Sequence, residues 1–212
     1  MNNFDLSIYN FIYGLNSPGL TMFMRVISSL GSAIVIITAL LCIFLLFKDK
    51  KIFLQFFTLT IVTKVINHII KIIVKRERPN VLTSLSVESG YSFPSAHTMI
   101  STVFYGFIIY LIMKNVKNKK IKNISIISLF IIIFLIGISR IYLGVHYATD
   151  VIFGFLFGFI ILFIFINLIY KKSRKNISFE LNNDSKKSEN INKINRTIKS
   201  SNKRENKIKN KK

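Results

Sequence analysis

The sequence predicts an all-α polytopic membrane protein, a helix bundle of about five transmembrane helices preceded by an N-terminal interfacial helix. Three observations support this fold class. The chain of 212 residues is 51% hydrophobic and has a mean hydropathy of +0.47. Its apolar residues form blocks long enough to cross a bilayer, and most polar residues lie between these blocks or after residue 170. Because backbone amides in hydrocarbon must be satisfied within each span, the spans are predicted as helices.

Residues 1–26 are predicted as an N-terminal interfacial segment. The stretch FDLSIYNFIYGLN, residues 4–16, is too short to span, and its aromatic content suits a helix in the outer membrane interface. Residues 1–24 contain no Lys or Arg, which places the N-terminus outside.

A membrane domain is predicted over residues 27–170. Its five spans are about 27–47, 52–75, 95–113, 123–139 and 150–170. The basic stretch 48–51, the 114–122 loop and the C-terminal tail alternate so that they share one face, which should be cytoplasmic. The opposite face then carries the 76–93 loop and the stretch 140–150.

Residues 171–212 are predicted as a basic, disordered cytoplasmic tail. They contain 15 Lys and Arg against 4 Asp and Glu, of a formal net charge of +21 for the chain, and few aromatic residues. The tail either attracts anionic lipid of the inner leaflet or only anchors the topology, and the second interpretation is favoured. Nucleic-acid binding is not expected.

Three polar clusters are predicted on the outer face. They are KIIVKRERP at 71–79, SFPSAHT at 92–98 and GISRIYLGVHYATD at 137–150. In the first cluster, Lys71 lies just inside the second span and Arg78 just past its end. Ionisable residues inside a span usually mark function.

Lys75 and Arg76 are interpreted as snorkelling at the interface, and the role of Lys64, about 10 Å deeper than Lys71, is left open.

The second cluster opens the third span at Pro94 and Ser95. The backbone amides of Ser95, Ala96 and His97 are expected to be free at a positive helix end, a geometry that binds phosphate. The alternative interpretation makes Ser95 an ordinary N-cap and His97 a lone interfacial histidine.

In the third cluster, His146 and Asp150 are one helical turn apart if the helix has begun there. A carboxylate on one ring nitrogen leaves the other free to attack, and Arg140 supplies a planar fork for phosphate oxygens. The cluster therefore predicts phosphoryl transfer to and from a histidine. A structural Asp–His contact capping the fifth helix explains this pair alone equally well.

Together the clusters resemble the type 2 phosphatidic acid phosphatase superfamily, which also contains vanadium haloperoxidases. Its motifs are K-x6-R-P, P-S-G-H and S-R-x5-H-x3-D. The matching residues here, in order, are Lys71, Arg78, Pro79, Pro94, Ser95, His97, Ser139, Arg140, His146 and Asp150. The resemblance covers roughly residues 20–170.

The resemblance implies a role for each residue. His146 would be the nucleophile, Asp150 would orient it, and His97 would protonate the leaving group. The phosphate would be held by Lys71, Arg78, Ser95, Arg140 and the amide of Ala96. No metal or other cofactor is implied, because fixed cations and amides can stabilise the charge.

Two departures from the family pattern stand out. Residue 96 is alanine where the motif has glycine, and activity is expected unless the backbone there needs positive φ. Many bacterial relatives have six spans, and this chain is expected to lack the first.

The leading expectation is a lipid phosphatase or diphosphatase of the plasma membrane, acting on a lipid phosphate at the outer face. Undecaprenyl diphosphate is favoured as substrate by analogy with small bacterial members. Phosphatidylglycerophosphate and phosphatidic acid are close alternatives. A lipid phosphotransferase and a non-enzymatic membrane protein are the rival functions.

Overall fold

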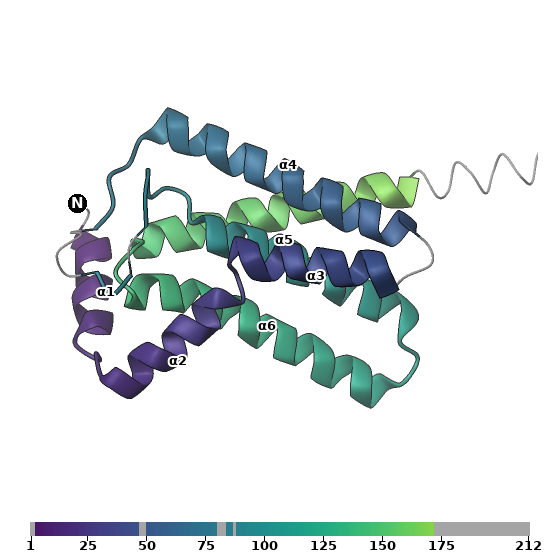
Figure 1. The fold of residues 1–212 in the computed structure, drawn as a ribbon, viewed down its shortest axis with the longest axis horizontal. Helices are drawn as coiled ribbons and strands as arrows, with labels where there is room; N and C mark the ends of the chain where they lie inside the picture. The colour runs from purple at the N-terminus through teal and green to yellow at the C-terminus, as the bar shows by residue number, and fades with distance from the viewer. Residues whose placement is uncertain (1–2, 47–49, 80–83, 87, 172–212) are drawn as a thin grey trace, which may run out of the picture. The chain divides into compact units, whose positions relative to one another are not determined.

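The computed structural model describes residues 3–46, 50–79, 84–86 and 88–171. The described residues contain helices and no strand, which confirms the all-α class (Figure 1). The labelled helices are α1 (Asn3–Tyr13), α2 (Pro18–Ser29), α3 (Ala33–Leu46), α4 (Lys50–Val74), α5 (Ala96–Asn115) and α6 (Lys119–Tyr142). A further helix, Ala148–Lys171, is called the C-terminal helix here. Residues 1–165 form one compact unit and residues 166–212 a second, and the predicted tail at 172–212 lies outside the described residues.

Four helices of the described chain are long and apolar enough to cross a membrane: α4, α5, α6 and the C-terminal helix. The predicted first span, 27–47, is not one straight helix. It is divided between α2 and α3, which meet at an angle of 45° and count as a fifth span only if taken together. The Gly–Ser pair at Gly31 and Ser32 explains the break, because such pairs are frequent kink sites. Gly31 is also required there, because a Cβ atom would lie 2.7 Å from the Oγ of Ser101.

Helix α2 begins earlier than the predicted span. Pro18 occupies its first turn, where a missing N–H costs nothing. The side chain of Ser17 caps the helix by accepting a hydrogen bond from the amide of Leu20. The predicted interfacial segment therefore contains α1 and most of α2.

The outward faces of these helices are apolar. The exposed fraction is above 70% at Ile34, Leu46 and Ile73. A water-facing surface rarely exposes so many large apolar side chains. Helix α5 is the most enclosed, because it packs against both α4 and α6. Lipid contact on the outside and a central α5 fit the predicted membrane bundle.

The C-terminal helix approaches α5 through small residues. A Cβ atom at Gly154 would lie 3.0 Å from Cβ of Thr98, and one at Gly158 would lie 2.8 Å from Cβ of Thr102. This small-xxx-small pattern allows two backbones to pack closely in lipid. As a result the beginnings of the two helices meet, and the amide of Ser95 donates a hydrogen bond to the carbonyl oxygen of Asp150 at 3.0 Å.

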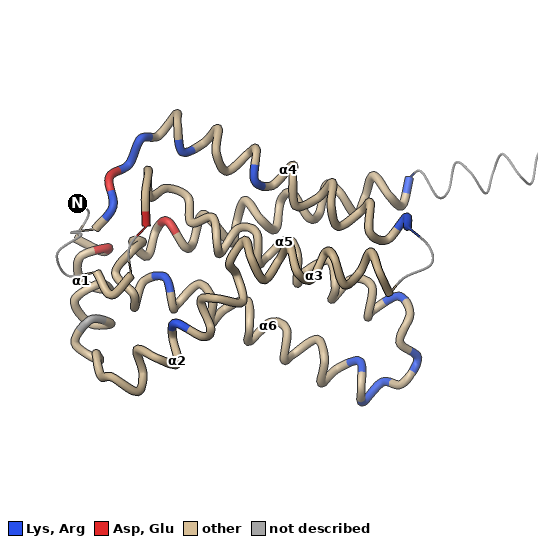
Figure 2. Tube along the Cα trace, in the orientation of Figure 1, with Lys and Arg blue, Asp and Glu red and all other residues tan. Residues whose placement is uncertain are grey.

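The described acidic residues gather at one end of the first unit, whereas basic residues lie at both ends. Figure 2 shows basic residues at the start of α4 and along the α5–α6 connection at one end, and the described acidic residues at the other. The start of α4 and the α5–α6 connection thus share one end, as the positive-inside pattern predicted.

Gly158→Ala is expected to lower the melting temperature of the detergent-solubilised protein, measured by circular dichroism. The added Cβ atom has no room against Thr102, and overpacking of this kind costs about 1–3 kcal/mol. Gly19→Ala is the matched control, because nothing lies within 4 Å of a Cβ atom at Gly19. Equal melting temperatures for the two variants would contradict the close packing.

Candidate active site

The turn after α6 places His146. Gly144 has a φ of 72°, the left-handed conformation that ends many helices. The amides of Val145 and His146 then both donate to the carbonyl oxygen of Arg140, at 3.3 Å each. A side chain at Gly144 would also press on the 84–86 segment, since its Cβ atom would lie 3.2 Å from Cα of Ser84. The turn therefore folds His146 back beside the end of α6.

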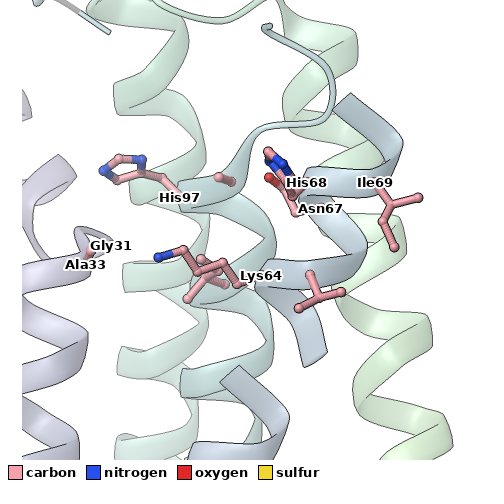
Figure 3. Close-up of a pocket in the computed structure, with 10 residues that line it drawn as sticks. Gly31, Ala33, Lys64, Asn67, His68, Ile69 and His97 are labelled. Carbon is pink, nitrogen blue, oxygen red and sulfur yellow. The ribbon is translucent and has the colours of Figure 1, made fainter. Parts of the chain in front are cut away.

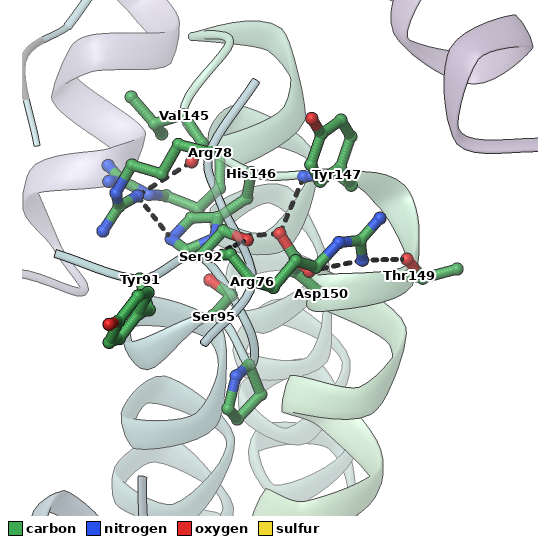
Figure 4. A network of polar contacts seen from close by, with 12 residues as sticks. Arg76, Arg78, Tyr91, Ser92, Ser95, Val145, His146, Tyr147, Thr149 and Asp150 are labelled. Atoms are coloured by element: carbon green, nitrogen blue, oxygen red, sulfur yellow. Dashed lines mark hydrogen bonds and ion pairs between the residues drawn. The ribbon is translucent and has the colours of Figure 1, made fainter. Parts of the chain in front are cut away.

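His146 lies between a carboxylate and a guanidinium group (Figure 4). Its Nδ1 atom is 3.4 Å from Oδ2 of Asp150, and its Nε2 atom is 3.4 Å from Nη1 of Arg78. A carboxylate only accepts and a guanidinium only donates, so the proton is assigned to Nδ1 and the lone pair to Nε2. The helix begins at Ala148, after His146, so the condition under which helix geometry pairs the two residues is not met, and the turn brings the two side chains together instead.

Burial sets the protonation state of His146. The side chain is 2% exposed, and burial lowers the pKa of His146 to about 4 against the opposing hydrogen bond with Asp150. The guanidinium groups of Arg140 and Arg78 act in the same direction as burial. The imidazole is therefore neutral near pH 7, as a nucleophile must be.

Asp150 is held from two sides. Its Oδ2 atom accepts a hydrogen bond from the amide of Tyr147 at 3.0 Å, and its Oδ1 atom accepts one from Nη1 of Arg76 at 2.7 Å. The interpretation of Arg76 as a snorkelling residue is wrong. Its guanidinium lies on the ring of Tyr147, 4.2 Å from the centroid, and points inward to the acids.

The second acid bound by Arg76 is Asp5 of α1. Nη2 of Arg76 donates to Oδ2 of Asp5 at 2.6 Å, and Asp5 also accepts the amide of Thr149 at 2.9 Å. Burial tends to raise the pKa of Asp5, but the hydrogen bonds from Thr149 and Arg76 outweigh it and keep the pKa below its usual value. Helix α1 is thereby tied to Asp150 through one arginine.

The predicted phosphate-binding cations converge. Lys71 donates to the carbonyl oxygens of Tyr91 and Ser92 and lies within electrostatic range of Arg78 and Arg140. Carbonyl oxygens fix Arg78 as well, at Val145 (2.8 Å), Gly90 (2.9 Å) and Ser89 (3.1 Å). These acceptors orient the cations without cancelling their charge.

Arg140 has a partner that the sequence did not suggest. Its Nη2 atom forms an ion pair with Glu88, its Nη1 atom donates to Oγ of Ser28, and its Nε atom has no acceptor among the described residues. Burial tends to raise the pKa of Glu88, but the nearby charges, with Arg140 first among them, and the hydrogen bond from Arg140 together outweigh burial and lower the pKa. Glu88 thus binds the guanidinium group of Arg140 that was predicted to bind phosphate.

The start of α5 departs from the prediction at one atom. The amide of Ser95 is not free, because it donates to the carbonyl oxygen of Asp150. The amides of Ala96 and His97 open the helix and have no intrahelical acceptor. The conformation of Ala96 does not need glycine, because Lys75 is the only non-glycine residue with positive φ in the described chain.

The second histidine, His97, lies within electrostatic range of His146, Arg78, Arg140 and Glu88. All eight predicted site residues therefore belong to one end of the helix bundle. Asp5, Arg76 and Glu88 were missed as parts of the site. Asp5 and Glu88 are two of only nine acids in the chain, and acids are rare in so basic a sequence, but their spacing matches no motif.

Among the residues that the structure describes, no three His, Cys, Asp or Glu side chains are grouped so that they could hold a metal ion. The positive charges that face the two histidines come from Arg78 and Arg140.

Comparisons with known proteins show the family to which the chain belongs. The profile of the PAP2 superfamily matches residues 52–174. Phosphatidylglycerophosphatase B of Bacillus subtilis (strain 168) is 35% identical over 102 residues, 48% of this chain and 50% of that protein. The chain therefore spans about half the length of this curated relative.

Two crystal structures are similar in fold. One is a transmembrane PAP2 type phosphatidylglycerolphosphate phosphatase from Bacillus subtilis, with a TM-score of 0.73 and 29% identity over 79% of this chain and 85% of that one. The other is Aquifex aeolicus LpxE, with a TM-score of 0.63 and 27% identity over 76% of this chain and 94% of that one. The superfamily match covers more than half of the chain and includes every predicted site residue, so the chain belongs to the PAP2 superfamily.

Proposed function

We propose that this protein is a membrane lipid phosphatase that hydrolyses a phosphomonoester head group at the extracytoplasmic face through a phosphohistidine. The observation that carries the proposal is the environment of His146. The Asp150 carboxylate faces one ring nitrogen and the Arg78 guanidinium faces the other. The lone pair of the neutral imidazole is therefore on the side of the cations.

In the first step, Nε2 of His146 attacks phosphorus and the bond from phosphorus to the ester oxygen breaks. The leaving oxygen takes a proton from His97, which is the general acid. Asp150 stabilises the positive charge that develops on the imidazole of His146.

In the second step, water attacks the phosphohistidine and the phosphorus–nitrogen bond breaks. His97, now neutral, accepts the proton of the water, and inorganic phosphate leaves. The two steps restore both histidines, so the cycle needs no other reactant.

Charge on the transferring group is stabilised by Lys71, Arg78, Arg140 and the amides of Ala96 and His97. Carbonyl oxygens already hold Lys71 and Arg78 in place, so these donors need little reorganisation. Ser95 contributes its hydroxyl group only, because its amide is bonded to Asp150. A phosphate that binds the guanidinium group of Arg140 displaces Glu88 from it.

Among lipid phosphates we favour phosphatidylglycerophosphate. The Bacillus subtilis relative found by sequence and the Bacillus subtilis structure found by fold both carry names that specify this substrate. The analogy that favoured undecaprenyl diphosphate has no support of this kind.

Asp5 and Arg76 are positioning residues in this mechanism. Arg76 occupies one oxygen of Asp150 and leaves the other for His146, and Asp5 fixes the second nitrogen of the Arg76 guanidinium. Asp5 is 1% exposed and Asp150 is fully buried, so the pair of acids holds one arginine in a low-dielectric setting.

Purified wild-type protein in detergent with EDTA should release phosphate from phosphatidylglycerophosphate. His146→Ala should abolish this release, because His146 is the nucleophile that forms the covalent intermediate in the proposed mechanism. His97→Ala should slow it by about 10²–10⁴-fold, the usual effect of removing a general acid. Phosphate release by a colorimetric assay measures both effects.

Phosphatidic acid and undecaprenyl diphosphate are the comparison substrates. A higher kcat/KM for undecaprenyl diphosphate would contradict the substrate assignment. Turnover that EDTA removes, or full activity of His146→Ala, would contradict the mechanism.

The His146 imidazole should titrate with a midpoint near pH 4, well below the ordinary value of about 6.5. The lowered pKa means that the neutral form persists as the pH falls through 6 and is lost only near 4. Carbon-13 NMR of histidine-labelled protein measures the midpoint, and the spectrum of His146→Asn assigns the signal. A midpoint at or above 6 would be inconsistent with the buried, neutral ring.

Asp5→Asn should lower kcat about tenfold with little change in KM. The substitution weakens the charged hydrogen bond between Asp5 and Arg76, and Arg76 positions Asp150. Asp5→Glu should recover part of the activity. Glu77→Gln is the control, because Glu77 is an exposed acid near Arg76 in sequence.

A double-mutant cycle separates positioning from general destabilisation. If Asp5 acts through Asp150, Asp5→Asn should cost much less in an Asp150→Asn background. Additive losses in kcat would show that Asp5 acts elsewhere.

A further inference from the structure

A second pocket borders the active site on the side of His97. It has a volume of about 470 Å³ and lies where α4, the start of α5 and the start of α3 meet. Lys64 and His68 of α4 line it together with Ala96, His97 and Gly31 (Figure 3). Its remaining lining is mostly apolar, so Lys64 is its main source of charge.

Lys64 lies close to His97 in depth. Asn67 of α4 donates from Nδ2 to the carbonyl oxygen of Pro94 at 3.2 Å, so this turn of α4 is level with the start of α5. Lys64 precedes Asn67 by three residues, which is about 4.5 Å along the helix. Figure 3 shows its ammonium group extending towards Gly31 and Ala33, below the ring of His97.

The ammonium group of Lys64 needs an anion. It belongs to a helix that crosses the membrane, about 15 Å from the end at Val74 and about 21 Å from the end at Lys50. Among the described residues it has no hydrogen bond or ion pair. Intramembrane lysines of this kind face a partner or a ligand.

The position of His97 identifies what enters this pocket. His97 protonates the leaving oxygen in the proposed mechanism, so the part of the lipid beyond the scissile bond lies next to it. In phosphatidylglycerophosphate that part is phosphatidylglycerol, whose phosphodiester is one glycerol unit from the scissile bond. In phosphatidic acid the corresponding part carries no charge.

We infer that Lys64 forms a second phosphate subsite, which binds the internal phosphodiester of lipids that carry two phosphate groups separated by a short linker. The inference rests on the proposed function, because it assigns the leaving-group side from His97. His68, four residues after Lys64, lines the same pocket, but its ring lies beside Asn67, away from the Lys64 ammonium group (Figure 3). The apolar remainder of the pocket accommodates the glycerol and the first carbons of the acyl chains.

The test compares two substrates in one set of variants. Lys64→Met keeps the length of the side chain and removes its charge, so kcat/KM for phosphatidylglycerophosphate should fall about tenfold or more, mainly through KM. For phosphatidic acid it should change less than about twofold. Lys64→Arg should retain most of the preference between the substrates. Lys114→Met, at the far end of α5, is the matched control and should change neither.

The outcomes separate a phosphate subsite from a structural role of Lys64 and from a wrong substrate assignment. Equal losses on both substrates would overturn the subsite and assign Lys64 a structural role. No loss on either substrate would also overturn it. Hydrolysis of phosphatidic acid but not of phosphatidylglycerophosphate by the wild-type protein would instead overturn the proposed substrate, and this result is recognised without any variant.

Discussion

The close contact between α5 and the C-terminal helix is the constraint on which the site depends. In lipid, apolar side chains gain nothing by leaving their surroundings, so helices associate through van der Waals packing and hydrogen bonds. Gly154 and Gly158 allow the backbone to reach the threonines of α5, and the two helix beginnings then meet. The hydrogen bond from the amide of Ser95 to the carbonyl oxygen of Asp150 follows from this approach. The motif of α5 and the motif of the C-terminal helix therefore share one small volume.

The cations of the site show how an apolar bundle tolerates charge. Arg76 lies between two buried acids, Arg140 is paired with Glu88, and Lys71 and Arg78 are fixed by carbonyl oxygens. Pairing removes part of the desolvation cost, whereas carbonyl oxygens orient a cation and leave its net charge. The first arrangement suits Arg76, which positions Asp150, whereas a phosphate that binds Arg140 has to displace Glu88. The second suits groups that face an incoming anion in a low-dielectric pocket.

Several features could be read from the sequence because they are local. Each later span needs about twenty apolar residues, and α4, α5 and α6 extend only a few residues beyond the predicted limits. Motif residues such as His146 and Arg140 were identified by spacing alone. The break at Gly31 was missed, because the apolar run continues through it and hydropathy does not register a bend. The helix start at Ala148, two residues after His146, could not be predicted from spacing, because a left-handed glycine determines that turn.

The sequence by itself determined the number and order of the apolar segments and the residue types available for phosphoryl transfer. It also determined that the three polar clusters lie at one end of the bundle. Only the tertiary structure decided the partners of those residues. Asp5 is separated from Arg76 by 71 positions and Glu88 from Arg140 by 52, and no periodic pattern links them. Ion pairs of this range form because the helices bring the chain segments together, so their physical cause lies in packing rather than in sequence spacing.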